Sequence, residues 1–395
     1  MRVFLNQLGI VCSLGEDADT VRQNLLRDDA EGGLSTDLHL AEQPLMLGKV
    51  LANLPSLEQL PVVLQGRNNA LLLTALEQIR EPAARAIARH GRDRVGVVLG
   101  TSTSGVGESE AAHLARQGEP GRGWPADYHY AQQEMGTPAA FVAAQLGIGG
   151  PAYVISTACS SSAKALAAAA RLLRSGQLDA VIAGGADSLC RFTVAGFSAL
   201  GAVSAQRCLP FSANRCGINI GEGAALFLVS GEDSAVELLG WGESADAHHM
   251  SAPDPAGRGP QAAIEAALAR AGLRPEQIDY VNLHGTATLQ NDQMEAAVVH
   301  RIFGAQTPVS STKPLTGHTL GAAGAIEAAL CWLSLSGNPQ QRLPPHWWDG
   351  AADGALPALA LVAPGAAASA PLRRVLTQSF AFGGSNAALI LGSAA

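Results

Sequence analysis

Charged and aromatic residues are scarce in this sequence, and it contains no basic run. Charged side chains make up 15% of its 395 residues and aromatic side chains 5%, and the formal net charge is −8. Nucleic-acid-binding proteins need clustered lysine and arginine to meet the phosphates, so we do not expect a nucleic-acid function. The negative net charge still allows a small basic patch for an acidic protein partner.

Cysteine is also scarce. The six cysteines are scattered over the whole chain, and none belongs to a CxxC pair. Paired cysteines at that spacing are typical of zinc sites and redox motifs, and dense cysteines are typical of secreted disulfide frameworks. The cysteine pattern therefore indicates reduced thiols in a cytoplasmic protein.

No apolar run is suited to cross a membrane. The two long stretches without charge, residues 137–163 and 354–372, are broken by glycine and proline, so neither is expected to form a spanning helix. The N-terminal residues, MRVFLNQLGIVCSLG, have no proper basic region ahead of their apolar part. They predict a first strand and not a signal peptide.

Apolar residues are abundant, at 47% of the chain, many of them alanine, with 44 glycines beside them. Short apolar segments alternate with alanine-rich helical segments, which predicts an α/β architecture with parallel or mixed sheets. The predicted strands are residues 95–99, 152–156, 180–183, 224–229, 236–239, 280–283, 375–379 and 387–391. Pro138 and Pro260 are expected to open helices, and Gly176 to close the helix that begins near Cys159.

Cys159 lies where a predicted strand meets a predicted helix, in residues 156–162, STACSSS. Unpaired backbone N–H groups and the helix dipole favour an anion at such a junction, so we expect the pKa of Cys159 to be lowered. The alternative is a buried small hydrophobic residue, which is what most free cysteines are. Position alone leaves the two interpretations balanced.

Two histidines occupy similar positions. His284 lies in residues 281–288, VNLHGTAT, and His318 ends residues 311–318, STKPLTGH. A single histidine is more often structural than functional. Two histidines beside strand ends, each flanked by Gly and Thr, indicate a shared site.

Together the three segments resemble the β-ketoacyl-acyl carrier protein synthases of the type I and II subgroup, condensing enzymes of the thiolase superfamily. In that family TACS carries the nucleophile, HGTxT the first histidine and KxxxGH the second. Residues 221–224 (GEGA) and 379–386 (SFAFGGSN) match two further motifs. The five motifs occur in the family's order and spacing over nearly the whole chain.

The resemblance implies an α/β thiolase fold with two similar halves that form a five-layer αβαβα sandwich. Residues 1–232 would form the N-terminal half with the nucleophilic cysteine, and residues 233–395 the C-terminal half with both histidines and the glycine loop. The acidic turn at residues 231–233 is the candidate midpoint. The family forms dimers, so we expect a homodimer or a heterodimer with a related ketosynthase or chain-length-factor-like subunit.

The resemblance also implies a reaction, the decarboxylative Claisen condensation of malonyl-ACP with an acyl group held as a thioester on Cys159, where ACP is the acyl carrier protein. The substrates would arrive on the phosphopantetheine of ACP, with no other cofactor and no metal. His284 and His318 would stabilise the enolate by hydrogen bonds. Lys313 and Glu327 would form a supporting pair that fixes the charge state of the site.

Further roles follow from the same resemblance. Backbone N–H groups of Cys159 and Phe382 would form the oxyanion hole, and Phe382 would also act as a gate beside the flexible pair Gly383 and Gly384. The residues expected to bind the pantetheine arm are Thr286 and Thr288. The residues expected to dock the acidic carrier protein are Arg67 and Arg207.

One motif departs from the family. Where the family usually has PFDxxRDG, residues 210–217 read PFSANRCG. Ser212 and Cys216 thus replace two aspartates, and Arg215 loses two expected anionic neighbours. These departures favour a specialised pathway, of the aryl polyene or polyketide type, over housekeeping fatty acid synthesis.

Other interpretations were weighed against this one. A thiolase would need a second catalytic cysteine near the glycine loop, and residues 379–386 contain none. Initiating and chalcone synthases use Cys-His-Asn, whereas residues 313–318 supply a second histidine here. A partner or scaffold subunit of a condensing heterodimer stays open, although an inactive chain-length factor would lack Cys159. A metal-binding protein would use Cys159, His284 and His318, but the chain has no close-spaced ligand pair. Residues 100–105, GTSTSG, lack the ending of a phosphate loop and predict a turn.

Overall fold

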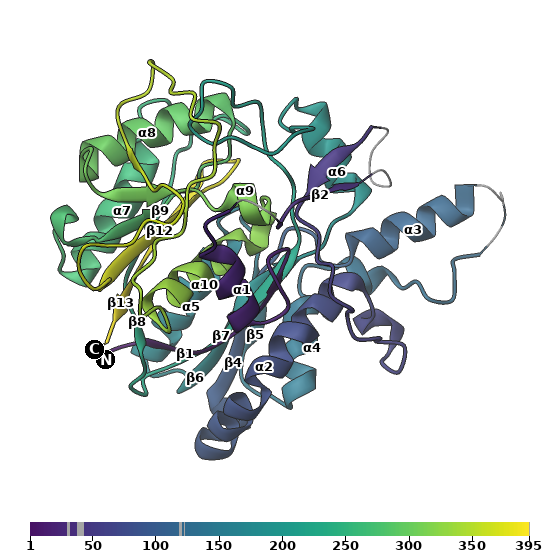
Figure 1. The fold of residues 1–395 in the computed structure, drawn as a ribbon. Helices are drawn as coiled ribbons and strands as arrows, with labels where there is room; N and C mark the ends of the chain where they lie inside the picture. Colours follow the sequence, from purple (N-terminus) through teal and green to yellow (C-terminus); the bar gives the residue numbers. More distant parts are fainter. Residues whose placement is uncertain (30–31, 38–42, 118–120, 122, 395) are drawn as a thin grey trace.

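Eleven of the described strands form one long mixed sheet with a seam near its middle (Figure 1). The computed structural model describes residues 1–29, 32–37, 43–117, 121 and 123–394. The strands of this sheet are β1 (Phe4–Cys12), β4 (Val95–Gly100), β5 (Ala152–Ile155), β6 (Ala180–Asp187), β7 (Gly223–Ser230), β8 (Val236–Ala245), β9 (Tyr280–Asn282), β10 (Pro308–Ser310), β11 (Ala360–Leu361), β12 (Arg374–Phe380) and β13 (Ser385–Ser393). At the seam, β1 pairs with β8 at Phe4 and Glu237. The sheet therefore consists of two parts.

The two parts repeat one topology. The first has the order β5-β4-β6-β7-β1, and the second has the order β10-β9-β12-β13-β8, with β11 added at its outer edge. In each part the first two pairings are parallel and the last two are antiparallel. The expected two similar α/β halves are confirmed. The proposed division after residue 232 would fall between β7 and β8, and it stays a prediction.

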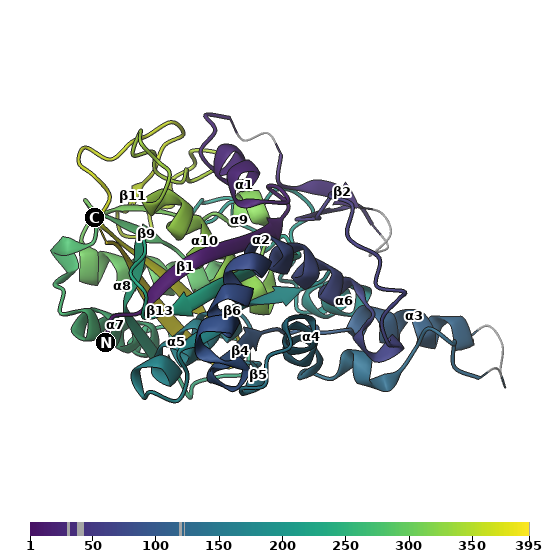
Figure 2. The same ribbon diagram turned by 90° about the horizontal axis from the view of Figure 1, so that it is seen from below.

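Helices separate and cover the two parts of the sheet, so that five layers result (Figures 1 and 2). The outer layer on the first part contains α2 (Arg67–His90) and α4 (Thr137–Leu146). The outer layer on the second part contains α7 (Arg258–Ala271) and α8 (Leu289–Phe303). The middle layer contains α5 (Ser161–Arg174) and α10 (Ala323–Leu335), which pack against each other and against both sheets.

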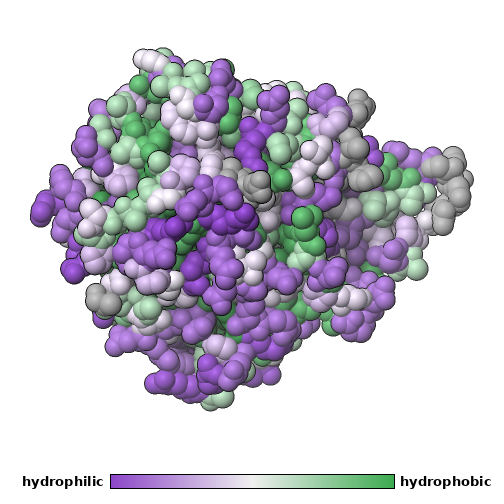
Figure 3. Space-filling view, in the orientation of Figure 1, coloured by the Kyte–Doolittle hydropathy of each residue, from purple (hydrophilic) through white to green (hydrophobic). Residues whose placement is uncertain are grey.

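Smaller elements lie around this core. They are α1 (Ala18–Leu25), α3 (Val106–Gln117), α6 (Arg191–Ala199), α9 (Lys313–Thr316) and the antiparallel pair β2 (Ser35–Asp37) and β3 (Leu45–Leu47). Helix α3 projects from the body in both views (Figures 1 and 2). Hydrophilic residues cover much of the surface in Figure 3, with hydrophobic residues in separate groups between them. None of the described helices has the length and apolar character that a membrane crossing requires.

Each predicted strand is present, whereas the predicted helix ends differ by small amounts. Pro138 is the second residue of α4, and Gly176 follows α5 with a φ of 71°, as a helix-closing glycine does. Helix α7 begins at Arg258, so the prediction that Pro260 opens it was wrong by two residues. Backbone N–H groups in the first turn of a helix have no partner within the helix, so proline, which lacks an N–H, is tolerated at several positions there. A proline therefore did not identify the first residue of α7.

The start of α5 lies directly against β4 and β6 because two glycines there have no side chain. A Cβ at Gly100 would lie 2.2 Å from the backbone N of Ser162, and a Cβ at Gly185 would lie 2.7 Å from Ser162 Cβ. The sequence prediction ended β6 at residue 183, because glycine is a weak strand former, but the strand continues through Gly185. This close approach places Cys159, just before α5, at the ends of the parallel strands.

The two middle helices approach each other closely at Gly324 in α10. A Cβ at this position would lie 2.7 Å from the Cβ and backbone N of Ala163 in α5. Alanine and glycine at the crossing bring the two backbones together, which explains the high alanine content of both helices. The position of α5, and with it that of Cys159, depends on this contact.

We expect Gly324→Ala to lower the thermal midpoint of unfolding, because added volume in a packed core costs about 1–3 kcal/mol. Gly196→Ala in α6 is the matched control, since a Cβ there would meet nothing within 4 Å. Alanine is a better helix former than glycine, so this control should keep or raise the midpoint. Circular dichroism melting of both variants tests the contact, and equal midpoints would contradict it.

Candidate active site

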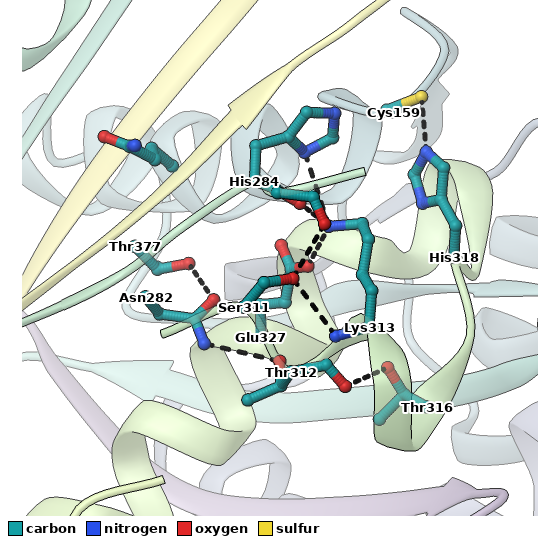
Figure 4. Close-up of polar contacts among 12 residues, drawn as sticks. Cys159, Asn282, His284, Ser311, Thr312, Lys313, Thr316, His318, Glu327 and Thr377 are labelled. Carbon is teal, nitrogen blue, oxygen red and sulfur yellow. Dashed lines mark hydrogen bonds and ion pairs between the residues drawn. The ribbon is translucent and has the colours of Figure 1, made fainter. Parts of the chain in front are cut away.

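Three residues distant in sequence meet at one point of the structure (Figure 4). Cys159 lies in the turn between β5 and α5, His284 follows β9, and His318 lies between α9 and α10. The Cys159 sulfur and one ring nitrogen from each histidine all lie within 4.8 Å of one another. Parallel strands that end at one edge of the sheet and a helix that starts there account for this convergence.

The Cys159 sulfur is surrounded by polar groups. Sγ lies 3.0 Å from Nε2 of His318, and the backbone N–H groups of Phe382 and of Cys159 itself face the sulfur. The preceding residue, Ala158, has a φ of 51°, in a left-handed region that alanine rarely adopts. A strained residue before a nucleophile is a common feature of functional turns. The turn thus aims the sulfur toward His318 and the glycine loop.

Burial, and not the helix start, decides the charge of the resting thiol. Burial raises the pKa of Cys159 to about 12, although Lys313 and the two backbone N–H groups act in the opposite direction. The expected lowering of this pKa was therefore wrong, because Cys159 is 5% exposed and α5 begins only at Ser161. The thiol is neutral at rest, and Nε2 of His318 is the ring atom in contact with its sulfur.

Beneath the two histidines lies a buried ion pair. Lys313 Nζ donates to Glu327 Oε1 and to the backbone carbonyl of His284, and it lies 3.4 Å from Nδ1 of that ring (Figure 4). Both members of the pair are at most 2% exposed. A buried charge is tolerated when it is paired and hydrogen-bonded, as this ammonium group is. The Lys313 ammonium group is therefore the positive charge beside the two histidines, and Glu327 is its counter-ion.

Both imidazoles are neutral. Burial lowers the pKa of His284 well below its usual value, and Lys313 and His318 lower it further. Burial and Lys313 have the same effect on the pKa of His318. Because Lys313 donates at Nδ1, a neutral His284 carries its proton on Nε2. The two rings meet edge to face, with centroids 5.4 Å apart.

Two buried carboxyl groups that the sequence analysis did not single out hold the backbone of the His284 turn. Glu295 accepts from the backbone N of His284 at 2.6 Å and of Gly285 at 2.7 Å. Asp292 accepts from the backbone N of Ala287 at 3.2 Å. Their spacing of three residues on α8, directly after the HGTAT segment, places both on the helix face toward the turn. That spacing was a signal that could have identified them.

The glycine loop, residues 379–386, forms part of the wall of the site. The ring of Phe382 packs against Phe197, with centroids 5.8 Å apart. Gly383 and Gly384 have φ values of 82° and 73°, which favour glycine. The loop therefore brings the Phe382 N–H to the sulfur with a backbone that few other residues could form.

A pocket of about 500 Å³ leads to these groups. Its lining includes Cys159, His284 and His318 together with Thr286 and Thr288, the residues expected to bind the pantetheine arm. The two threonine hydroxyls lie 2.9 Å apart. Apolar side chains such as those of Phe197, Leu200, Ile218 and Leu289 complete the lining.

Arg215 has an anionic partner, although the family's two aspartates are missing. Its Nη1 donates to Asp353 Oδ2 at 2.7 Å and to the Ser212 carbonyl at 2.7 Å. Ser212 and Asn214 in turn donate to Asp349 at 2.7 Å each. The sequence analysis found no anionic neighbour for Arg215 because Asp349 and Asp353 come from a loop that is distant in sequence.

The two arginines expected to dock a carrier protein have contacts within the chain. Arg67 forms a bidentate pair with the buried Glu222, at 2.8 Å and 2.5 Å. Arg207 is partly buried and donates to the Pro314 carbonyl at 2.7 Å. Neither residue lines the pocket, and their docking role stays a prediction.

The geometry also bears on two alternatives, a metal site at Cys159 and a phosphate loop at residues 100–105. Two ligands of one tetrahedral zinc ion, at bond lengths of about 2.3 and 2.0 Å, would lie about 3.5 Å apart. The 3.0 Å between Cys159 Sγ and His318 Nε2 fits a direct hydrogen bond better. Residues 101–105 form a turn after β4, and the N–H groups of Ser102 and Thr103 donate to the Asp187 carboxyl group and so do not face outward as those of a phosphate loop would.

Comparison with known proteins gives one family for both parts of the chain. Residues 67–235 match the domain described as "Beta-ketoacyl synthase, N-terminal domain", and residues 235–346 match "Beta-ketoacyl synthase, C-terminal domain". Nodulation protein E of Rhizobium meliloti is 31% identical over 98% of each chain. The 3-oxoacyl-[acyl-carrier-protein] synthase 2 of Staphylococcus aureus is 31% identical over 85% of this chain and 86% of its own.

A solved structure is similar over the full length. It is a ketosynthase (ApeO) in complex with its chain length factor (ApeC) from Xenorhabdus doucetiae, 46% identical to this chain with a TM-score of 0.90. The match covers 100% of this chain and 98% of that chain. This likeness confirms the expected α/β fold of the thiolase type.

We expect Asp353→Asn to lower the thermal midpoint of unfolding, because it leaves the Arg215 guanidinium, with a side chain 5% exposed, without its carboxylate. Glu276→Gln is the control, since its pair with Arg274 has both side chains 77% exposed and such pairs contribute little. Scanning calorimetry measures both. Shifts of equal size would show that Asp353 does not support Arg215.

Proposed function

This chain belongs to the beta-ketoacyl synthase family, and we propose that it condenses malonyl-ACP with an acyl group held as a thioester on Cys159. As a family member it is an acyltransferase of the condensing type. The observation that carries the proposal is the meeting of Cys159, His284 and His318 in one pocket, within 4.8 Å. A thiol and two neutral imidazoles suit the opening of a thioester and the stabilisation of an enolate.

In the first step the Cys159 sulfur attacks the carbonyl carbon of an acyl-ACP thioester. The bond from that carbon to the carrier sulfur breaks, and the thiol proton passes to the departing phosphopantetheine thiolate, while His318 Nε2 stays beside the sulfur. The N–H groups of Cys159 and Phe382, which face the sulfur, would hold the carbonyl oxygen as it becomes negative. Acyl-Cys159 and free carrier thiol result.

In the second step malonyl-ACP enters the pocket and loses its carboxylate as CO2, which leaves an enolate on the thioester. His284 and His318 donate hydrogen bonds to the enolate oxygen, and their neutral state leaves each ring with one N–H to donate. The enolate carbon attacks the acyl carbonyl, the bond to Cys159 breaks, and the thiolate takes up a proton from solution. The products are β-ketoacyl-ACP, CO2 and the free thiol.

Supporting roles follow for residues around the reacting atoms. Lys313, held by Glu327, would position His284 and help to keep both rings neutral. Thr286 and Thr288, which line the pocket, would bind the pantetheine arm. All other chemistry would come from the substrates, which the phosphopantetheine of ACP carries, so that no resident metal or cofactor takes part.

We further propose that a second condensing-type subunit pairs with this chain, in a specialised pathway of the aryl polyene or polyketide type. The support is the similarity to a ketosynthase in complex with its chain length factor. The edge strand β5 has exposed residues at Ala152 and Tyr153, as a strand that awaits a partner would. A cytoplasmic location fits the free thiol state of all six cysteines. Arg67 and Arg207 remain our candidates for carrier docking.

Mass spectrometry of the intact protein after incubation with a panel of acyl-ACP thioesters tests the proposal. We expect the mass of one acyl group on Cys159, no condensation with Cys159→Ala, and continued malonyl-ACP decarboxylation with Cys159→Gln, which fills the site but cannot accept an acyl group. An acyl group on the Cys159→Ala variant would refute the assignment. If the protein takes up no acyl group from any carrier, it is the scaffold subunit instead.

A further inference from the structure

A lysine that the reaction above does not use connects the glycine loop to the helix that follows Cys159. Lys164 lies in the first turn of α5, and its Nζ donates to the hydroxyl of Ser385 at 2.6 Å. Ser160 donates to the same hydroxyl oxygen at 2.9 Å, and its own oxygen lies 2.9 Å from the Thr157 carbonyl. Ser385 is therefore held by one donor from the helix and one from the nucleophile turn.

The held residue ends a closed turn that carries Phe382. The backbone N of Ala381 donates to the Ser385 carbonyl at 2.9 Å, and that of Gly384 donates to the Ala381 carbonyl at 3.0 Å. Gly383 N also donates to the Met250 carbonyl at 2.8 Å, so Ser385 is one of the two anchors between which the Phe382 N–H is held. A displacement of Ser385 would therefore displace the Phe382 N–H relative to the Cys159 sulfur.

The contact between Lys164 and Ser385 removes part of the hydration of the lysine ammonium group. Lys164 is partly buried, and burial lowers its pKa. Glu243, the nearby carboxylate, is paired with Arg171 at 2.5 Å, and within the described part of the chain Lys164 forms no ion pair. A partly buried ammonium group gives up some of its hydration, and within the described residues the Ser385 hydroxyl is the acceptor given for it.

We propose that Lys164 is a positioning residue, which clamps Ser385 and thereby sets the distance between the two oxyanion-hole N–H groups, those of Cys159 and Phe382. The inference rests on the proposed function, because it assigns these N–H groups to acyl transfer. The proposed clamp should affect the two half-reactions, acyl transfer and malonyl decarboxylation, differently. Acyl transfer to Cys159 depends on the clamped N–H pair, whereas malonyl decarboxylation depends on His284 and His318, which the clamp does not touch.

The test compares Lys164→Met and Ser385→Ala, singly and together, in two assays. Rapid-quench acylation of Cys159 from acyl-ACP should slow by about tenfold to a hundredfold in each single variant, since loss of a whole oxyanion donor costs about 10²–10³ in rate. The double variant should be no slower than the slower single one, because both changes break one clamp. Malonyl-ACP decarboxylation, measured in a Cys159→Gln background, should change less than about twofold.

Arg174→Met is the matched control, because it removes a cation from the same helix at an exposed position over the Trp241 ring, away from Glu243. It should leave both assays at the level of the unaltered protein. Equal losses in acylation and decarboxylation for Lys164→Met would indicate a general structural role and overturn the proposal. Unchanged acylation would overturn it as well.

A second measurement does not depend on the reaction. Hydrogen–deuterium exchange should be faster at residues 380–386 in Lys164→Met and Ser385→Ala, with no change elsewhere in β12 or β13. If the unaltered protein accepts no acyl group, the proposed function fails, while exchange still tests the clamp. Exchange that matches the unaltered protein would show that Lys164 does not hold the loop.

Discussion

The site depends on one buried ion pair. Lys313 and Glu327 lie below His284 and His318, and both are almost completely shielded from water. An ammonium group at this depth requires a carboxylate and further acceptors, and the His284 carbonyl supplies one. The same charge disfavours protonation of either imidazole. The pair thus fixes the histidine backbone and the charge state of both rings.

This arrangement separates the fixed charge of the site from its reacting groups. At rest the thiol and both rings are neutral, so negative charge appears only during the reaction, on the thioester oxygen and then on the enolate oxygen. Each oxygen would meet its own donors, backbone N–H groups in one case and imidazole N–H groups in the other. The unfolded chain would bind protons at the histidines near pH 6.5 and the folded chain would not, so acidification below that pH favours unfolding.

The sequence predicted the parts of this site that local patterns encode. Strand ends followed by small-residue turns located Cys159, His284 and His318, and the fold class followed from the alternation of strands and helices together with the motif order. Contacts between distant segments were not accessible. Asp353 reaches Arg215 from a loop far along the chain, and the pKa of Cys159 depends on how deeply packing buries it. Local sequence showed the helix dipole but not the desolvation that outweighs it.

Nuclear magnetic resonance of the ring nitrogens, with ¹⁵N-labelled histidine, tests the central claim directly. His284→Asn and His318→Asn variants assign the two signals. The account predicts that both rings stay neutral as the pH falls from 8 to 6, with the proton of His284 on Nε2, because burial and Lys313 lower both pKa values. Protonation of either ring with a midpoint at pH 6.5 or above would contradict it.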